Sequence, residues 1–183
     1  EISKQGRKIQ QFVQTEYRLD KQRILDLIQN NISCEHNRII YSKQLDGKFQ
    51  LLNLKGVFLL SATEIPKLTF HTHDFVNIIY CPNVVKVCED GVSECLNLVQ
   101  FYSKKLETAD VRAFYFCNCM VKFNFSSLKQ LQRQSFSDCN SLVNINLPLV
   151  EKLSDECFYN CTGMLQIIAP KLMQNDYVFE QHT

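Results

Sequence analysis

The chain has 183 residues, 45% of them hydrophobic, and its 20 basic and 19 acidic residues give a formal net charge of +1. This near-neutral balance argues against nucleic-acid binding by a repeat surface, which needs a basic stripe to neutralise phosphates. The sequence contains no apolar run of about eighteen residues, so it predicts no membrane span. The hydrophobic share is sufficient for one continuous core.

Residues 1–53 lack the periodicity of the rest of the chain and predict an N-terminal cap. Asp20 is a candidate N-cap for a helix over Lys21–Asn30, and apolar residues at helical spacing indicate an earlier helix over Lys8–Thr15. Several residues here are basic, so a small DNA-binding helical motif is an alternative. Acidic residues lie among the basic ones and leave little excess positive charge, which favours packing as a cap.

A hairpin is expected at the end of this segment. Asp46 and Gly47 lie between two apolar stretches, Arg38–Gln44 and Phe49–Leu54, and Asp-Gly between apolar runs is a hairpin signal. Such a hairpin would cover the otherwise open edge of the first strand that follows, which a stacked sheet must protect. We therefore expect a helical and hairpin cap over residues 1–53.

From Leu54 onward the sequence repeats with a period of 22 residues. Cysteine and phenylalanine mark the phase, at Cys95, Cys117, Cys139 and Cys161 and at Phe70, Phe114, Phe136 and Phe158. A period in this range indicates a stacked solenoid over residues 54–183, because one such unit cannot bury its apolar face alone. The five full repeats are 54–75, 76–97, 98–119, 120–141 and 142–163, and a partial sixth ends at Thr183. Both ends of the chain read as cuts in a longer protein.

Each repeat opens with a segment of alternating apolar residues. In the fifth repeat we expect Leu142, Ile145 and Leu147 to face inward from a short strand. Pro148 follows directly and fits the end of a strand, since proline cannot donate to the next ladder. Later in the repeat, apolar residues are spaced by three, at Val150 and Leu153 and at Phe158 and Cys161, which is typical of short helical or 3₁₀ turns.

Two segments in this register, Ala113–Cys117 and Cys157–Cys161, together with the opening Leu142–Pro148, resemble the BspA-type leucine-rich repeat family. The usual form of that repeat is Leu-x-x-Ile-x-Ile-Pro followed by Ala/Cys-Phe-x-x-Cys. The resemblance implies an α/β repeat solenoid with a parallel β-sheet on the concave side and an interaction role. The convex side would then carry short turns or 3₁₀ or helical segments.

This chain departs from the family pattern at two places in the repeat. It lacks the frequent glycine before the Ala/Cys-Phe pair, and Cys81 and Ser103 occupy the last inward position of the strand. These departures leave the predicted fold unchanged but leave the loop geometry of individual repeats open.

The nine cysteines are expected to be reduced. Successive strands of a parallel stack lie about 4.8 Å apart, so equivalent cysteines would have parallel Cβ vectors at that separation. A disulfide prefers Cβ atoms about 3.5–4.5 Å apart. Buried thiols that act as small hydrophobic groups explain the cysteine ladder more simply, and disulfide pairing is the alternative.

We expect no metal, cofactor or catalytic site. Cys117 and Cys119, like His71 and His73, are separated by one residue, whereas the ligands of a zinc knuckle are separated by about two to four. His73 occupies a cysteine position of the repeat and is expected to be a hydrogen-bonded histidine. The sequence has no glycine-rich phosphate loop, no Gly-x-Ser-x-Gly and no His-Glu-x-x-His.

The concave face is the expected binding surface for a protein partner. Strand alternation turns the third and fifth residues of each repeat outward, while Val57, Ile79 and Phe101 turn inward. Aromatic rings on consecutive strands would lie at stacking distance, and exposed aromatic patches mark binding surfaces. The alternative is that the rings stack only for stability, and a register error of one residue would exchange the two sets. The expected contact residues are Phe58, Tyr80, Tyr102, Gln100, Lys122, Asn124, Asn144 and Asn146.

Two classes of function follow. The first is a non-catalytic protein-interaction module in the cytoplasm, where thiols stay reduced. The second is a cell-surface or secreted adhesin-like protein, which the resemblance also permits. N-glycosylation sequons begin at Asn31, Asn124 and Asn160, but a glycan on Asn124 would block the concave face. A signal peptide upstream would favour the second class.

Overall fold

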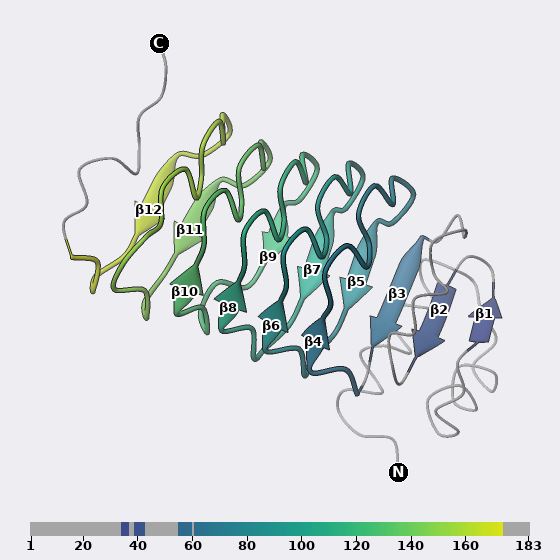
Figure 1. Cartoon of the computed structure of the whole chain (residues 1–183). Coiled ribbons are helices and arrows are strands. Elements are labelled where there is room, and N and C mark those ends of the chain that lie inside the picture. Colours follow the sequence, from purple (N-terminus) through teal and green to yellow (C-terminus); the bar gives the residue numbers. More distant parts are fainter. Residues whose placement is uncertain (1–33, 37–38, 43–54, 60, 174–183) are drawn as a thin grey trace.

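The computed structural model describes residues 34–36, 39–42, 55–59 and 61–173, and side chains from residue 55 onward (Figure 1). These residues form a solenoid of stacked repeats built from short strands and turns, and none of them is helical. The helices expected over Lys8–Thr15 and Lys21–Asn30 lie outside this described part.

The first sheet runs along the solenoid and contains the opening strands of the first four repeats. Its six hydrogen-bonded strands follow the order β1-β2-β3-β5-β7-β9, and β11 and β12 form a separate pair beyond them. The 22-residue register is confirmed, because Gly56 pairs with Ile78, Ile78 with Gln100 and Gln100 with Lys122, all in parallel. The strands are β1 (Cys34–His36), β2 (Ile39–Ser42), β3 (Gly56–Leu59), β5 (Ile78–Tyr80), β7 (Gln100–Tyr102), β9 (Lys122–Phe123), β11 (Asn144–Asn146) and β12 (Gln166–Ile168).

A second parallel sheet lies along another side of the solenoid (Figure 1). It consists of β4 (Glu64–Ile65), β6 (Lys86–Val87), β8 (Thr108–Ala109) and β10 (Gln130–Leu131), again paired at a spacing of 22 residues. In the fifth repeat it continues only as a single bridge between Leu131 and Leu153.

The helical or 3₁₀ segments expected on the convex side are wrong for the described residues. The spacing of three arises instead from separate turns, each closed by one bond between residues three apart. In the fifth repeat the N–H of Tyr159 donates to the carbonyl of Glu156 at 3.1 Å, and that of Cys161 to Phe158 at 3.3 Å. Glu156 and Asn160 have positive φ angles of 58° and 53°, which no right-handed helix contains, so the turns do not continue into one.

Among the described residues, ten other than glycine have positive φ, and they fall into two columns of the repeat: Leu68, Asp90, Arg112, Gln134 and Glu156, then Thr72, Glu94, Phe116, Asp138 and Asn160. The first column directly precedes the Ala/Cys-Phe position, where the family often has glycine. We call this side of the solenoid, residues 110–119 of the third repeat and their equivalents, the loop face. Its geometry is kept without glycine, at a conformational cost of about 1–3 kcal/mol for each such residue.

Hydrogen bonds between repeats hold the loop face in this conformation. In the third repeat the N–H groups of Arg112, Phe114 and Phe116 donate to carbonyl oxygens of the fourth repeat at 3.1, 2.9 and 2.9 Å. The inward phenylalanines of this face also stack, with ring centroids of Phe114 and Phe136 4.9 Å apart. Stacking and hydrogen bonds together offset the strain.

The hairpin expected between Arg38–Gln44 and Phe49–Leu54 is wrong. Ile39–Ser42 forms β2, which lies between β1 on one side, antiparallel, and β3 on the other, parallel. Both edges of β2 are therefore occupied, and no edge is left for an antiparallel partner from Phe49–Leu54, which lies outside the described residues. The expected covering of the first repeat's strand is provided by β2, whose Ile39 pairs with Gly56.

The cysteine ladder lies in the core. Cys95, Cys117, Cys139 and Cys161 are all at most 2% exposed, and each thiol donates to a backbone carbonyl 25 residues earlier in the chain, at 3.0–3.2 Å. Burial raises the pKa of the Cys117 thiol well above its usual value. The ladder is therefore packed and hydrogen-bonded as thiol, and a reactive thiolate is disfavoured there.

Candidate partner-binding surface

Tyr80 and Tyr102 occupy adjacent strands of the first sheet and point away from the core. Strand alternation buries the residue that precedes each tyrosine, Ile79 or Phe101, and leaves both tyrosines half-buried. Their rings are parallel, with centroids 4.7 Å apart and an interplanar angle of 2°. The expected register and stacking of this pair are confirmed.

Phe58 does not belong to the exposed surface, so its expected exposure is wrong. Its side chain is only 1% exposed, although its ring lies 5.9 Å from Tyr80, as the stacking expectation required. The sheet does not end at β3, because β2 pairs with it and places Tyr41 opposite Phe58. Phe58 is thus an internal position of the sheet, and the accessible aromatic surface is reduced to the two tyrosines.

The expected polar residues continue the same outward columns. Gln100 is half-buried, and Lys122, Asn124, Asn144 and Asn146 are exposed. The side chain of Asn124 is held by two bonds: its amide donates to the carbonyl of Ser103 at 3.4 Å, and its oxygen accepts from the N–H of Ser126 at 3.1 Å. The other four make no side-chain hydrogen bond within the described residues and are available to a partner.

The structure brings only part of this set together. Gln100 pairs with Lys122 in the continuous sheet, next to the two tyrosines. Asn144 and Asn146 belong to β11, which pairs with β12 and not with β9. The two asparagines therefore lie across a break in the sheet from the rest of the expected contact residues.

The surface is polar but carries little charge. Burial, followed by the neighbouring Tyr102 and Cys81, raises the pKa of Tyr80 to about 12, so its hydroxyl stays neutral at physiological pH. The outward columns from Ile78 to Ile168 contain one cation, Lys122, and no carboxylate. Such a face offers hydroxyl and amide groups, which both donate and accept hydrogen bonds, and one ammonium group, which only donates.

Sequence reasoning did not assign the exposed aliphatic column that borders this face. Val99, Val121, Val143 and Leu165 precede the strands by one residue and are 37, 53, 41 and 83% exposed. The three valines were already visible as a column at the 22-residue spacing, but the pattern alone did not tell which side of the strand entry they occupy. They add apolar contact area along one edge of the polar surface.

The histidines and cysteines that could suggest a metal do not converge. Nδ1 of His71 bonds Oγ of Ser93 at 2.7 Å, and Nδ1 of His73 bonds the carbonyl of His71 at 3.0 Å. Across the side chains that are described, no group of three or more potential ligands is close enough to hold a metal ion. None of the described segments is a helix long and apolar enough to cross a membrane.

Two solved structures share this fold. A leucine rich repeat protein from T. pallidum matches 70% of this chain and 62% of its own, with 21% identity and a TM-score of 0.59. A leucine rich cell surface protein from Faecalibacterium prausnitzii matches 76% of this chain and 35% of its own, with 15% identity and a TM-score of 0.54. This chain therefore spans less than two thirds of either protein's length. No curated protein matches the chain in sequence.

The repeat sequence matches one family over most of its length. Residues 50–183 match the BspA type leucine rich repeat region in six copies. The match coincides with the repeats whose register the strand pairing shows, and it includes the turns that lack glycine. The chain belongs to the family of BspA-type leucine-rich repeat proteins.

Proposed function

We propose that this protein is a non-catalytic module that binds a protein partner on the concave face of the solenoid, which we identify with the outward face of the first sheet. The observation that carries the proposal is the stacked pair Tyr80–Tyr102, with rings 4.7 Å apart on a hydrogen-bonded sheet. Because their strands fix the two rings, little side-chain entropy is lost when a partner covers them. Tyrosine is also enriched among residues that dominate binding energy.

Neighbouring groups give the tyrosines the surroundings of a binding centre. Gln100 and Lys122 supply unbonded polar groups beside them, and the exposed Val99 and Val121 supply apolar area along the border. An apolar and aromatic centre with a polar rim is the usual anatomy of a protein interface. The proposal assigns no catalytic residue, metal or cofactor, and at a net charge of +1 it does not include nucleic acid.

Alanine substitution of both tyrosines tests the proposal. The partner is first isolated with the wild-type protein as bait, and its affinity is then measured by calorimetry for wild type and for Tyr80→Ala/Tyr102→Ala. We expect the double variant to lose at least about 2 kcal/mol of binding free energy. Tyr159→Ala, which removes an exposed tyrosine from the loop face, is the matched control and should bind as wild type. Equal affinity of the double variant and wild type, or an equal loss in the control, would contradict the proposal.

A surface or secreted adhesin-like role is the second candidate. One similar solved structure is named as a leucine rich cell surface protein, and that name favours this candidate. The hydrogen-bonded thiol ladder favours the cytoplasmic module, since an oxidising compartment would expose the thiols to pairing during folding. Surface biotinylation of intact cells that express the natural full-length protein separates the two locations. Alkylation of the denatured native protein counts free thiols, and a cytoplasmic module should show nearly all nine.

A further inference from the structure

Successive repeats are joined on both sheets by pairs of hydrogen bonds that share one acceptor. On the first sheet the carbonyl of Val99 accepts from the N–H groups of Val121 and Lys122, at 3.0 and 3.1 Å. On the second sheet the carbonyl of Glu107 accepts from Lys129 and Gln130, at 2.9 and 3.1 Å. The same arrangement recurs at the preceding junctions, with Lys55, Asn77 and Val85 as acceptors.

Both of these bond pairs are missing at the fourth junction, between the repeats 120–141 and 142–163. The carbonyl of Val121 receives no bond from Val143 or Asn144, all three being described residues, and β9 and β11 fall in separate sheets. On the second sheet, within the same described stretch, neither Glu151 nor Lys152 donates to Lys129, and only the Leu131–Leu153 bridge is left. Regular bonding resumes at the next junction, where Leu165 and Gln166 donate to Val143.

The loop face crosses the same junction without interruption. The N–H groups of Phe136 and Asp138 donate to Cys157 and Tyr159, both at 2.9 Å. The rings of Phe136 and Phe158 stack at 5.6 Å, and those of Phe114 and Phe136 stack at 4.9 Å one junction earlier. The two parts of the solenoid are thus attached along one face and separated along the other two.

The size of the inward side chains accounts for the separation. In each repeat the opening segment contributes two inward residues, and the pairs in the neighbouring repeats, Phe101 with Ser103 and Ile145 with Leu147, contain at most one aromatic ring. In the fourth repeat both positions hold phenylalanine, Phe123 and Phe125, with centroids 4.4 Å apart. Phe125 also lies 5.3 Å from Phe136 and 6.4 Å from Phe158 in the following repeat. Excess volume in a packed core forces backbone shifts, and the sheet is interrupted at the junction that follows these two rings.

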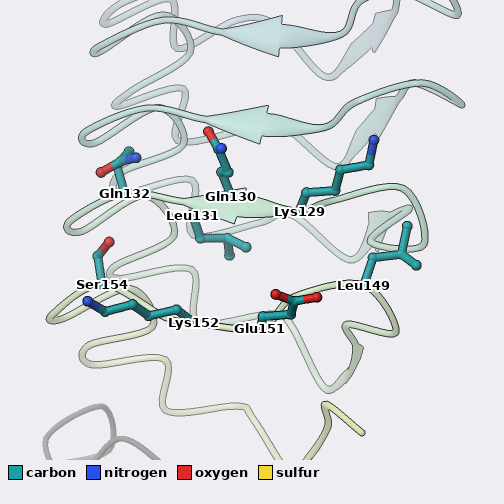
Figure 2. Close-up of a pocket in the computed structure, with 8 residues that line it drawn as sticks. All are labelled: Lys129, Gln130, Leu131, Gln132, Leu149, Glu151, Lys152 and Ser154. Atoms are coloured by element: carbon teal, nitrogen blue, oxygen red, sulfur yellow. The ribbon is translucent and has the colours of Figure 1, made fainter. Parts of the chain in front are cut away.

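A pocket of about 460 Å³ opens where the second sheet separates (Figure 2). Figure 2 shows one wall formed by residues of the fourth repeat and the other by residues of the fifth. Most of the lining side chains are polar, so water can enter the gap and solvate the unpaired peptide groups. The residues are Lys129, Gln130, Leu131 and Gln132 on one side and Leu149, Glu151, Lys152 and Ser154 on the other.

We propose that the fourth junction is a hinge, at which residues 142–173 tilt against residues 55–141 about the loop face. Tilting breaks no backbone hydrogen bond on either sheet beyond the Leu131–Leu153 bridge. The only side-chain bonds it would lengthen there, among the described residues, are the long ones from Sγ of Cys157 to the carbonyls of Leu131 and Gln132, at 3.7 and 3.5 Å. Phe125 acts as the wedge that holds the sheets apart. The motion changes the separation of Lys122 from Asn144 and Asn146, and therefore the shape of the first sheet's outward face. The hinge does not depend on whether a partner binds there.

Pulsed electron paramagnetic resonance on the whole chain tests the hinge. Spin labels are attached through p-acetylphenylalanine in place of Glu64 and Lys152, so that the native thiols are left unmodified. These positions share a column across four junctions, about 19 Å apart by strand spacing. The control pair, in place of Glu64 and Gln130, spans three junctions, about 14 Å, and does not cross the fourth. We expect a broader distance distribution for the spanning pair than for the control pair.

Phe125→Leu should remove the wedge, since Leu59 and Leu147 occupy the same position in other repeats. We expect the spanning distribution to narrow to the width of the control pair and its mean to shorten. Phe101→Leu makes the same change where the ladder is continuous and should leave the spanning distribution broad. A spanning distribution that is as narrow as the control in the wild type, or that is unaltered by Phe125→Leu, overturns the proposal.

Hydrogen exchange of the wild-type protein gives a second test that needs no substitution. The amides of Val143, Asn144, Glu151 and Lys152 should exchange at least about tenfold faster than those of Val121, Lys122, Lys129 and Gln130, which occupy the same columns one repeat earlier. Equal protection of the two sets would show that the sheets are continuous in solution, and the hinge would then be rejected even if Phe125→Leu failed to fold.

Discussion

The loop face and the first sheet differ in backbone strain and in how continuously their hydrogen bonds connect successive repeats. The loop face carries ten strained residues other than glycine, yet its hydrogen bonds run from repeat to repeat without a gap. The first sheet has ordinary extended strands, yet it is interrupted between β9 and β11. Local backbone strain therefore does not determine whether the hydrogen bonding between repeats is continuous. The volume of the inward side chains determines it. That volume fits the available space on the loop face and exceeds the available space at Phe123 and Phe125.

Removing a ring from the continuous face should have the largest effect. Phe114 is fully buried, and its ring lies 4.8 Å from Phe101 and 4.9 Å from Phe136. We expect Phe114→Ala to lower the free energy of unfolding by about 3–5 kcal/mol, because the cavity cannot be refilled from a column that is already matched. Urea unfolding measures this loss.

Substitutions of two other phenylalanines are compared with Phe114→Ala. Phe125→Leu should cost far less than Phe114→Ala, since it relieves excess volume at the interrupted junction. Phe75→Ala, at a half-exposed surface position, should change the unfolding free energy by less than about 0.5 kcal/mol. Equal losses for Phe114→Ala and Phe125→Leu would contradict the view that core volume distinguishes the two faces.

An ion pair on the strained column should have an intermediate effect that depends on pH. Nε and Nη2 of Arg112 donate to the carboxylate of Asp90 at 2.9 and 2.7 Å, and these bonds lower the pKa of Asp90. The stabilisation is therefore present above the unfolded pKa of about 3.9 and is lost as the pH falls through the lower folded value. Arg112→Met should cost about 1 kcal/mol at pH 7, since Arg112 is partly exposed and solvent screens the pair.

The pH series supplies the check on this pair. The difference in unfolding free energy between wild type and Arg112→Met should shrink as the pH falls from the unfolded pKa of Asp90 through its lower folded pKa. Arg133→Met breaks the more exposed pair with Glu156, whose distance is 3.1 Å, and should cost less at every pH. A difference that does not vary with pH would show that Arg112 acts through packing rather than charge.

Relief of strain should give the smallest effect, with the opposite sign. Leu68 has a φ of 59° and an exposed side chain, so glycine can adopt its conformation without losing core contacts. We expect Leu68→Gly to raise the free energy of unfolding by about 0.5–1 kcal/mol, after the entropy cost of glycine is subtracted. Leu96→Gly, at an exposed position outside the strained columns, should lower it. Destabilisation by both changes would mean that the left-handed column carries no strain.

The 22-residue spacing was enough to predict the stacking and the strand register, because every aligned column adds evidence for one phase. It also placed Tyr80 and Tyr102 on the outward side of adjacent strands. The exposure of Phe58 was predicted wrongly because its environment depends on β2. This strand lies before the first repeat and has no periodic signal. Helical turns were expected because apolar residues late in each repeat are spaced by three. Separate turns that contain left-handed residues produce the same spacing.

The interruption at the fourth junction could not be predicted from the periodicity either, and the reason differs from that for Phe58. Phe123 and Phe125 each fit the apolar pattern of their own column, and a pattern of hydrophobic positions does not record the summed volume of one repeat. Only packing reveals that two acceptable residues are together too large. The same interruption divides the candidate surface, because Asn144 and Asn146 follow the register of Lys122 and Asn124 but lie beyond the break.

Left-handed residues that are not glycine also determine the side-chain chemistry of the loop face. A glycine column would present bare backbone there, identical in every repeat. In this chain the same column carries the side chains of Leu68, Asp90, Arg112, Gln134 and Glu156, of which Asp90 is buried and forms an ion pair with Arg112 of the next repeat. Each repeat can thus change its chemical character at this position while the backbone is held by the ladder, so the molecule has a second variable surface whose composition can diverge independently of the sheet.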